Sequence, residues 1–124
     1  MKLKLVLKYK WYDFIETGIK KHEYRSVKPS IVRLLFKVPK HYTVEQFTKQ
    51  LIEHPADPLL WQYLKPIEDV VFYRGYSSDR KQMQLKVTGI EIGTAKPEWS
   101  DNWQGNVFII KLGKIITNNT NNGK

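Results

Sequence analysis

The residues best suited to chemistry lie in the eight-residue segment GIKKHEYR, positions 18–25, where three bases, an acid, a histidine and a tyrosine are packed together. A strand is predicted from residue 20 onward, with Glu23 and Arg25 on the same face, about 6.6 Å apart along it. A carboxylate there can accept a hydrogen bond from a base edge or pair with a neighbouring cation. A guanidinium can bind a phosphate with two hydrogen bonds or stack on a base.

The same residues allow two other interpretations. Glu23 and Arg25 could form a buried ion pair that only fixes the local structure. Alternatively, Glu23 could act as a general base, with Lys20 or Arg25 stabilising negative charge in a hydrolytic reaction. The residues leave open whether the protein is an enzyme.

A second candidate is the segment FYRGY, residues 72–76, which sets Tyr73, Arg74 and Tyr76 around Gly75. Alternating aromatic and basic residues suit single-stranded nucleic acid, because bases stack on the rings and phosphates meet the arginine. The alternative is an ordinary strand end, with Phe72 in the core and Tyr73 half exposed.

A later segment, PEWSDNWQG, contains Trp99 and Trp103. Exposed tryptophan is uncommon, so one of the two is expected to pack against the core while the other is a candidate for base stacking. The nucleic-acid contacts predicted in this way are Lys20, Lys21, Glu23, Arg25, Tyr73, Arg74, Tyr76 and Trp99.

Charge favours a polyanionic partner. Lys and Arg number 21 against 12 Asp and Glu, a formal net charge of +9. Such a balance favours nucleic acid first and an anionic membrane surface second, although a basic face that merely keeps the protein soluble would look the same. The chain has no cysteine, which excludes disulfides and thiolate chemistry and fits a reducing cytoplasm. The three histidines are scattered, so no metal or other cofactor is predicted.

The elements that must position these residues can be read from hydrophobic spacing. Residues 2–10 alternate leucines and Tyr9 with lysines, which predicts a half-buried strand and not a signal peptide or a membrane span. Helical spacing predicts a helix over 11–17 that ends at Gly18, and another that begins near Pro29. Residues 37–67 are interpreted as a helical insertion, with a capping box at Thr43 and Gln46 and an N-cap at Asp57.

The rest of the chain has strand character. Its apolar parity changes across Gly89, as a bulge or a barrel corner would require. The order of elements predicts an α+β domain over residues 1–116, with a small, strongly bent antiparallel or mixed sheet that a compact barrel would satisfy. Residues 117–124 are predicted to be a disordered tail.

The spacing Gly18-x-Lys20-x-x-Glu23-x-Arg25 resembles the GxKxxExR signature of the ASCH domain family, a branch of the PUA-like β-barrels. The flanking LKYKWYDFIETGIKKHEYR, and the later VVFYRGY and VTGIEIGTAKPEW, are similar to small ASCH proteins of bacteria and phages. The resemblance covers roughly residues 2–116. It implies a PUA-like barrel of five to six strands, with a helix after the first strand and a cleft flanked by the signature strand and that helix.

The resemblance also implies RNA binding, with some members acting on nucleic acid or modified nucleosides. In the branch that deacetylates a modified cytidine, a threonine nucleophile stands where this chain has Glu23, so the same acyl intermediate cannot form here. Three hypotheses follow: binding of RNA or other single-stranded or modified nucleic acid through the motif's cleft, hydrolysis of RNA or a modified nucleoside with Glu23 as base, and a protein-interaction module.

Overall fold

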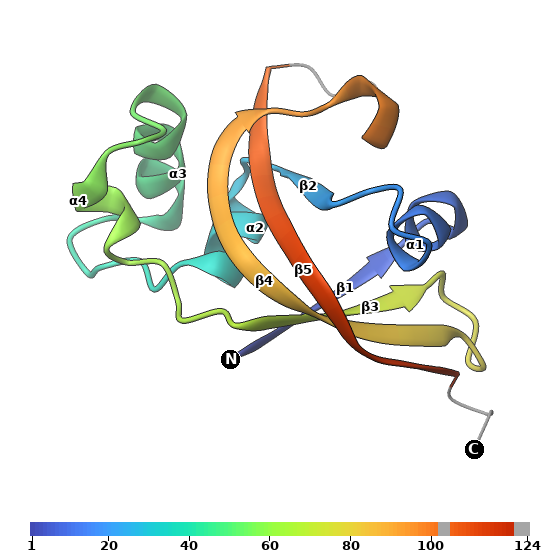
Figure 1. The fold of residues 1–124 in the computed structure, drawn as a ribbon. Helices are drawn as coiled ribbons and strands as arrows, with labels where there is room; N and C mark the ends of the chain where they lie inside the picture. The colour runs from blue at the N-terminus through green and yellow to red at the C-terminus, as the bar shows by residue number, and fades with distance from the viewer. Residues whose placement is uncertain (102–104, 121–124) are drawn as a thin grey trace. The chain divides into compact units, whose positions relative to one another are not determined.

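A computed structural model describes residues 1–101 and 105–120, and Trp103 lies outside this described part. The predicted α+β class is confirmed. Strands alternate with helices at the start of the chain, three helices follow, and long strands complete it (Figure 1). The elements are β1 (Lys2–Leu7), α1 (Tyr9–Glu16), β2 (His22–Ser26), α2 (Pro29–Leu35), α3 (Val44–Glu53), α4 (Pro58–Trp61), β3 (Asp69–Arg74), β4 (Lys81–Thr94), the 3₁₀ helix η1 (Pro97–Trp99) and β5 (Asn106–Thr120).

Within the described residues the strands form one five-stranded sheet in the order β1-β3-β4-β5-β2. Strand β1 pairs with β3 in parallel, so that Leu5 lies opposite Phe72, whereas β3 pairs with β4 in antiparallel register. The sheet is therefore mixed, one of the two forms predicted. A parallel neighbour for the first strand requires a long crossover connection, and the helical segment between β2 and β3 lies within it.

Backbone contacts divide the chain into two compact units. The first unit comprises Met1–Glu23, Ile67–Gly89 and the chain from Lys111 onward, and the second comprises Tyr24–Pro66 and Ile90–Ile110. Strand β4 passes from one unit to the other after Gly89, the position where the apolar parity of the sequence changes.

The core of the first unit forms between its strands and α1. Leucines at alternate positions of β1 are buried, as predicted, together with residues of β3 and β4. Helix α1 buries Trp11, Tyr12 and Ile15. The helix begins at Tyr9, two residues earlier than predicted, and β1 ends at Leu7. Tyr9 is 54% exposed, not buried on the strand face as the alternation had indicated.

An aromatic cluster forms the core of the second unit. Phe36, at the end of α2, lies 5.3 Å from Phe47 of α3 and 5.1 Å from Trp61 of α4, measured between ring centroids. Phe108 of β5 meets Phe36 and Trp61 at 6.0 and 6.3 Å. The predicted helical insertion is thus packed on the β5 segment of its own unit. Each offset or edge-on ring pair contributes about 0.5–1.5 kcal/mol beyond its buried area.

Both predicted helix starts in the insertion are present. The Thr43 hydroxyl accepts a hydrogen bond from the Gln46 backbone at 3.0 Å, and the Gln46 side chain accepts one from the Thr43 N–H at 2.8 Å. Asp57 caps α4 by accepting from Leu59 N–H at 2.9 Å.

The last strand corrects one boundary. Strand β5 continues to Thr120, so residues 117–120 are strand where a disordered tail was predicted. Repeated asparagine suggested a loop, but threonines at 117 and 120 favour the extended backbone. Residues 121–124 lie outside the described part of the chain. Among the helices of that part, none is both long and apolar enough to cross a membrane.

Candidate nucleic-acid interface

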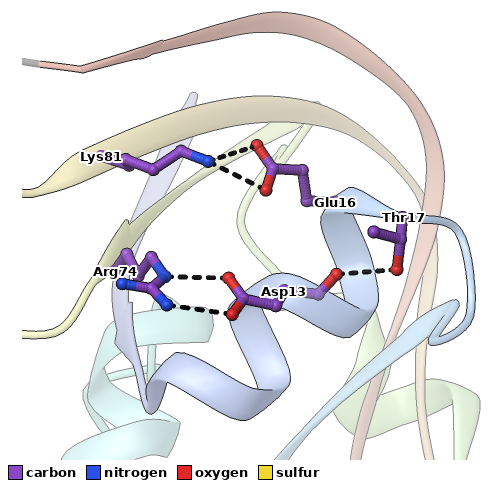
Figure 2. A network of polar contacts seen from close by, with 5 residues as sticks. All are labelled: Asp13, Glu16, Thr17, Arg74 and Lys81. Atoms are coloured by element: carbon purple, nitrogen blue, oxygen red, sulfur yellow. Dashed lines mark hydrogen bonds and ion pairs between the residues drawn. The ribbon is translucent and has the colours of Figure 1, made fainter.

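Two ion pairs tie α1 to the strands of the first unit (Figure 2). Arg74, the last residue of β3, donates to both carboxylate oxygens of Asp13, from Nε at 2.8 Å and from an Nη at 3.0 Å. Lys81, at the start of β4, donates to both oxygens of Glu16 at 3.0 and 2.9 Å. The hydrogen bond from Arg74 lowers the pKa of the Asp13 carboxyl, and Asp13 in turn raises the pKa of Arg74.

The same guanidinium also lies on an exposed ring. The Arg74 Cζ is 4.3 Å from the centroid of Tyr9, whose side chain is largely in solvent. Gly75 permits this approach because its φ is +70° and a Cβ there would overlap the Tyr9 ring. The sequence FYRGY therefore requires its glycine for two reasons, backbone conformation and space.

A second arginine covers a second tyrosine. Arg80, in the turn before β4, places its Cζ 4.2 Å from the Tyr73 ring centroid and donates to the Gly75 carbonyl at 3.4 Å. Tyr73 and Arg74 point to opposite faces of β3 because neighbours in a strand alternate. Tyr76 extends from the turn and is 85% exposed. We call these residues, which lie on both faces at the end of β3 and in the turn that follows it, the Tyr–Arg surface: Tyr9, Tyr73, Arg74, Tyr76 and Arg80.

Two charged residues of the Gly18–Arg25 motif, Lys20 and Glu23, are buried. The Lys20 ammonium lies 3.2 Å from a carboxylate oxygen of Glu23, and the two side chains are 2% and 6% exposed. The same ammonium lies 4.4 Å from the Trp11 ring centroid, a cation–π contact. The structure thus contains a buried ion pair of Glu23 with Lys20, whereas the alternative drawn from the sequence was a buried pair of Glu23 with Arg25.

The backbone after α1 sets this pair in place. Gly18 takes a φ of +80°, and the N–H groups of Ile19 and Lys20 both donate to the Phe14 carbonyl, at 2.8 and 2.9 Å. This C-terminal turn directs Lys20 back under the helix. Lys21, one residue on, is exposed, whereas Glu23 is buried. The reason is that β2 begins only at His22.

Two of the predicted contacts belong to the second unit. Arg25 is half-buried on β2. Trp99, in η1, packs against a buried cluster that contains Tyr24, Val107 and Ile109, and the Lys96 ammonium lies 4.4 Å from its ring centroid. The Trp99 ring therefore has the packing role that the sequence proposed for one of its two loop tryptophans.

The structure thus places Tyr73 and Arg74 on opposite faces of the end of β3, with Tyr76 in the turn that follows, and pairs them with residues that the sequence did not single out. Tyr9 was assigned to a strand core, and Arg80 to a plain turn. Asp13 was not singled out, because it joins Arg74 across 61 positions of the chain. Tyr9 lies where the alternating strand pattern ends and the helical spacing begins, and this position could have indicated that its side chain is exposed.

Within residues 1–101 and 105–120 no group of three or more His, Cys, Asp or Glu side chains is arranged to hold a metal ion. No protein-family model, no curated protein and no solved structure matches this chain.

Proposed function

We propose that this chain is an ASCH-type protein of PUA-like fold that binds single-stranded nucleic acid, RNA in the first instance, through the Tyr–Arg surface. The carrying observation is the turn after β3, where an arginine lies against each of two tyrosine rings and a third tyrosine is 85% exposed. The exposed rings of Tyr9 and Tyr76 offer a stacking surface for bases, and the Arg80 guanidinium offers a cation for phosphates. The net charge of +9 acts in the same direction.

The motif pair has a different role in this proposal. The Glu23 carboxylate is buried and bound to Lys20, so neither group stands ready to contact a polymer or activate water. We assign to the pair the positioning of α1 against the start of β2, and with it the position of Tyr9 on the same helix. The cytoplasm, as a reducing compartment, is the location that fits a chain without cysteine.

Fluorescence anisotropy tests the function directly. Labelled single-stranded RNA, single-stranded DNA and duplexes are titrated with the full chain across a salt series. We expect single strands to bind more tightly than duplexes, with log K falling by about 0.7 per phosphate contacted for each unit of log salt.

The matched variants are Tyr76→Ala and Tyr76→Phe. One base stack is worth about 1–3 kcal/mol, so Tyr76→Ala should weaken binding about fivefold or more. Tyr76→Phe keeps the ring and should bind like the wild type. If Tyr76→Ala binds as tightly as the wild type, or if duplexes bind as well as single strands, the proposal is wrong.

A further inference from the structure

The first unit contains a pocket of about 470 Å³ that the Tyr–Arg surface does not include. This volume lies within the range of about 300–1,000 Å³ typical of small-molecule sites. The pocket lies between the end of α1, the segment that leads into β2, and strands β4 and β5. Its lining residues are Ile15, Glu16, Thr17, Gly18, Lys20, Lys21, Leu85, Leu112, Gly113, Lys114 and Ile115.

One part of the lining is apolar and the rim is basic. Ile15, Leu85 and Leu112 supply aliphatic surface against which a flat ring can pack. The Leu112 N–H donates to the Lys21 carbonyl at 3.0 Å, which joins the two segments that carry the rim. Lys114 lies two residues beyond Leu112 on the same strand face, and both rim lysines are exposed.

The remaining polar side chains of the lining are Glu16, Thr17 and Lys20, and most of them are already engaged. Glu16 accepts two hydrogen bonds from Lys81. The Thr17 hydroxyl donates to the Asp13 carbonyl at 2.8 Å, and its oxygen can still accept from a ligand hydroxyl. Lys20 is bound to Glu23. The cations positioned to meet an anion from solvent are therefore Lys21 and Lys114.

A terminal phosphate suits this charge better than an internal one. A phosphate monoester carries about −1.5 to −2 charges at neutral pH, which two lysines balance. A phosphodiester inside a strand carries a single charge, so it would leave one of the two lysine charges unbalanced.

We propose that this pocket binds a nucleoside monophosphate group, with the base against the aliphatic lining and the phosphate between Lys21 and Lys114. The group could be a free mononucleotide or the phosphorylated end of a strand. The second source rests on the nucleic-acid function proposed above, and the first does not.

The test begins with small ligands. The four ribonucleoside monophosphates, uridine and inorganic phosphate are titrated into the full chain and followed by isothermal calorimetry and by amide chemical shifts. We expect at least one monophosphate to bind more tightly than uridine and than phosphate, with shifts centred on residues 15–21 and 112–115. Equal affinity for phosphate and nucleotide, shifts elsewhere, or no binding would overturn the proposal.

Charge-reversed variants give the matched comparison. Lys114→Glu and Lys21→Glu should each weaken monophosphate binding by about tenfold or more, because each replaces a direct phosphate contact with a repulsive charge. Lys4→Glu changes the net charge equally from an exposed position on β1 outside the pocket and should have little effect. Equal weakening by Lys4→Glu and Lys114→Glu would show a general charge effect and would contradict the site.

RNAs with different ends distinguish a free mononucleotide from a phosphorylated RNA end as the ligand. They also distinguish the pocket from the Tyr–Arg surface. Short single-stranded RNAs with a 5′-phosphate, a 3′-phosphate or only hydroxyl ends are compared. If a terminal phosphate increases the affinity for RNA, and this increase is lost in Lys114→Glu but kept in Tyr76→Ala, the ligand of the pocket is the strand end. Mononucleotide binding without such a gain identifies the free nucleotide. If only Tyr76→Ala, and not Lys114→Glu, weakens the binding of hydroxyl-ended RNA, the result supports the Tyr–Arg surface and leaves the conclusion about the pocket unchanged.

Discussion

Arg74 holds Asp13 with two parallel hydrogen bonds, of 2.8 and 3.0 Å, and joins the end of β3 to the middle of α1 across 61 residues of sequence (Figure 2). The flat face of the same guanidinium lies on Tyr9. One arginine thus fixes the helix and orients an exposed ring. A lysine could supply the charge but not the paired hydrogen bonds or the stacking plane.

This ion pair predicts a pH-dependent contribution to stability. Arg74 lowers the folded-state pKa of Asp13 below the ordinary value of 3.8, so the contribution is fully present above that value and is lost as pH falls through the lowered pKa. Asp13→Asn should reduce the free energy of unfolding at neutral pH by about 0.5 kcal/mol, a modest figure because both side chains are partly solvated. Urea denaturation of the wild type and Asp13→Asn, at a series of pH values from neutral to below the lowered pKa, measures this difference in the free energy of unfolding.

The difference between wild type and Asp13→Asn should shrink as the pH falls below about 4, because the wild-type carboxyl then becomes protonated. Glu53→Gln, on the exposed end of α3, controls for loss of a surface carboxylate and should have little effect. A difference that grows on acidification would contradict the assigned pair.

Gly75 and Gly18 offer a comparison of two glycines with nearly the same backbone. Both have positive φ, +70° and +80°, but an added Cβ meets the Tyr9 ring at Gly75 and has no atom within 4 Å at Gly18. Each alanine variant should lose about 1–2 kcal/mol from the left-handed backbone. Gly75→Ala should additionally displace Tyr9 and weaken RNA binding, which Gly18→Ala should not do.

Denaturation and anisotropy on the two glycine variants check this expectation. In a Tyr9→Ala background, Gly75→Ala should lower the free energy of unfolding only by the contribution of the left-handed backbone, since the ring that it displaces is gone. If Gly18→Ala and Gly75→Ala weaken RNA binding equally, the Tyr9 ring does not contribute to the interface.

Local patterns predicted the elements of this fold well. The alternation of Leu3, Leu5 and Leu7 gave a strand whose leucines are buried, and the side chains of Thr43 and Asp57 marked two helix starts. These features depend on residues within one or two turns of each other. The boundary at Tyr9 was misplaced because its place in the strand alternation fits equally well as the first residue of a helix.

The candidate site was only half predictable. The segment FYRGY singled out Tyr73, Arg74 and Tyr76, because a glycine among aromatic and basic residues is a local signal. Its partners Tyr9 and Asp13 are brought to it by the parallel pairing of β1 and β3, which no local pattern encodes. A buried pair of Glu23 was one alternative drawn from the sequence, but its partner Lys20 was not assigned to that pair, because the turn at Gly18 and not strand alternation places Lys20.

The capping box at the start of α3 predicts a measurable loss in the second unit. Thr43→Ala removes the oxygen that accepts the Gln46 N–H at 3.0 Å and should lower the free energy of unfolding by about 1 kcal/mol. Thr43→Ser retains the hydroxyl and should be close to wild type. Urea denaturation of the three proteins decides the point, and an alanine variant as stable as wild type would show that the cap contributes nothing.

The buried pair of Lys20 and Glu23 makes the strongest prediction. Removing one partner leaves the other charge buried, so Lys20→Met and Glu23→Leu should each cost about 3–5 kcal/mol. The double variant leaves neither charge behind and should be more stable than the sum of the two losses predicts, by about 0.5–3 kcal/mol. Lys21→Met, at the exposed neighbouring lysine, is the matched control and should be nearly neutral. Additive losses in this cycle would mean that the two side chains are not coupled, and would contradict the role assigned to the pair in positioning α1.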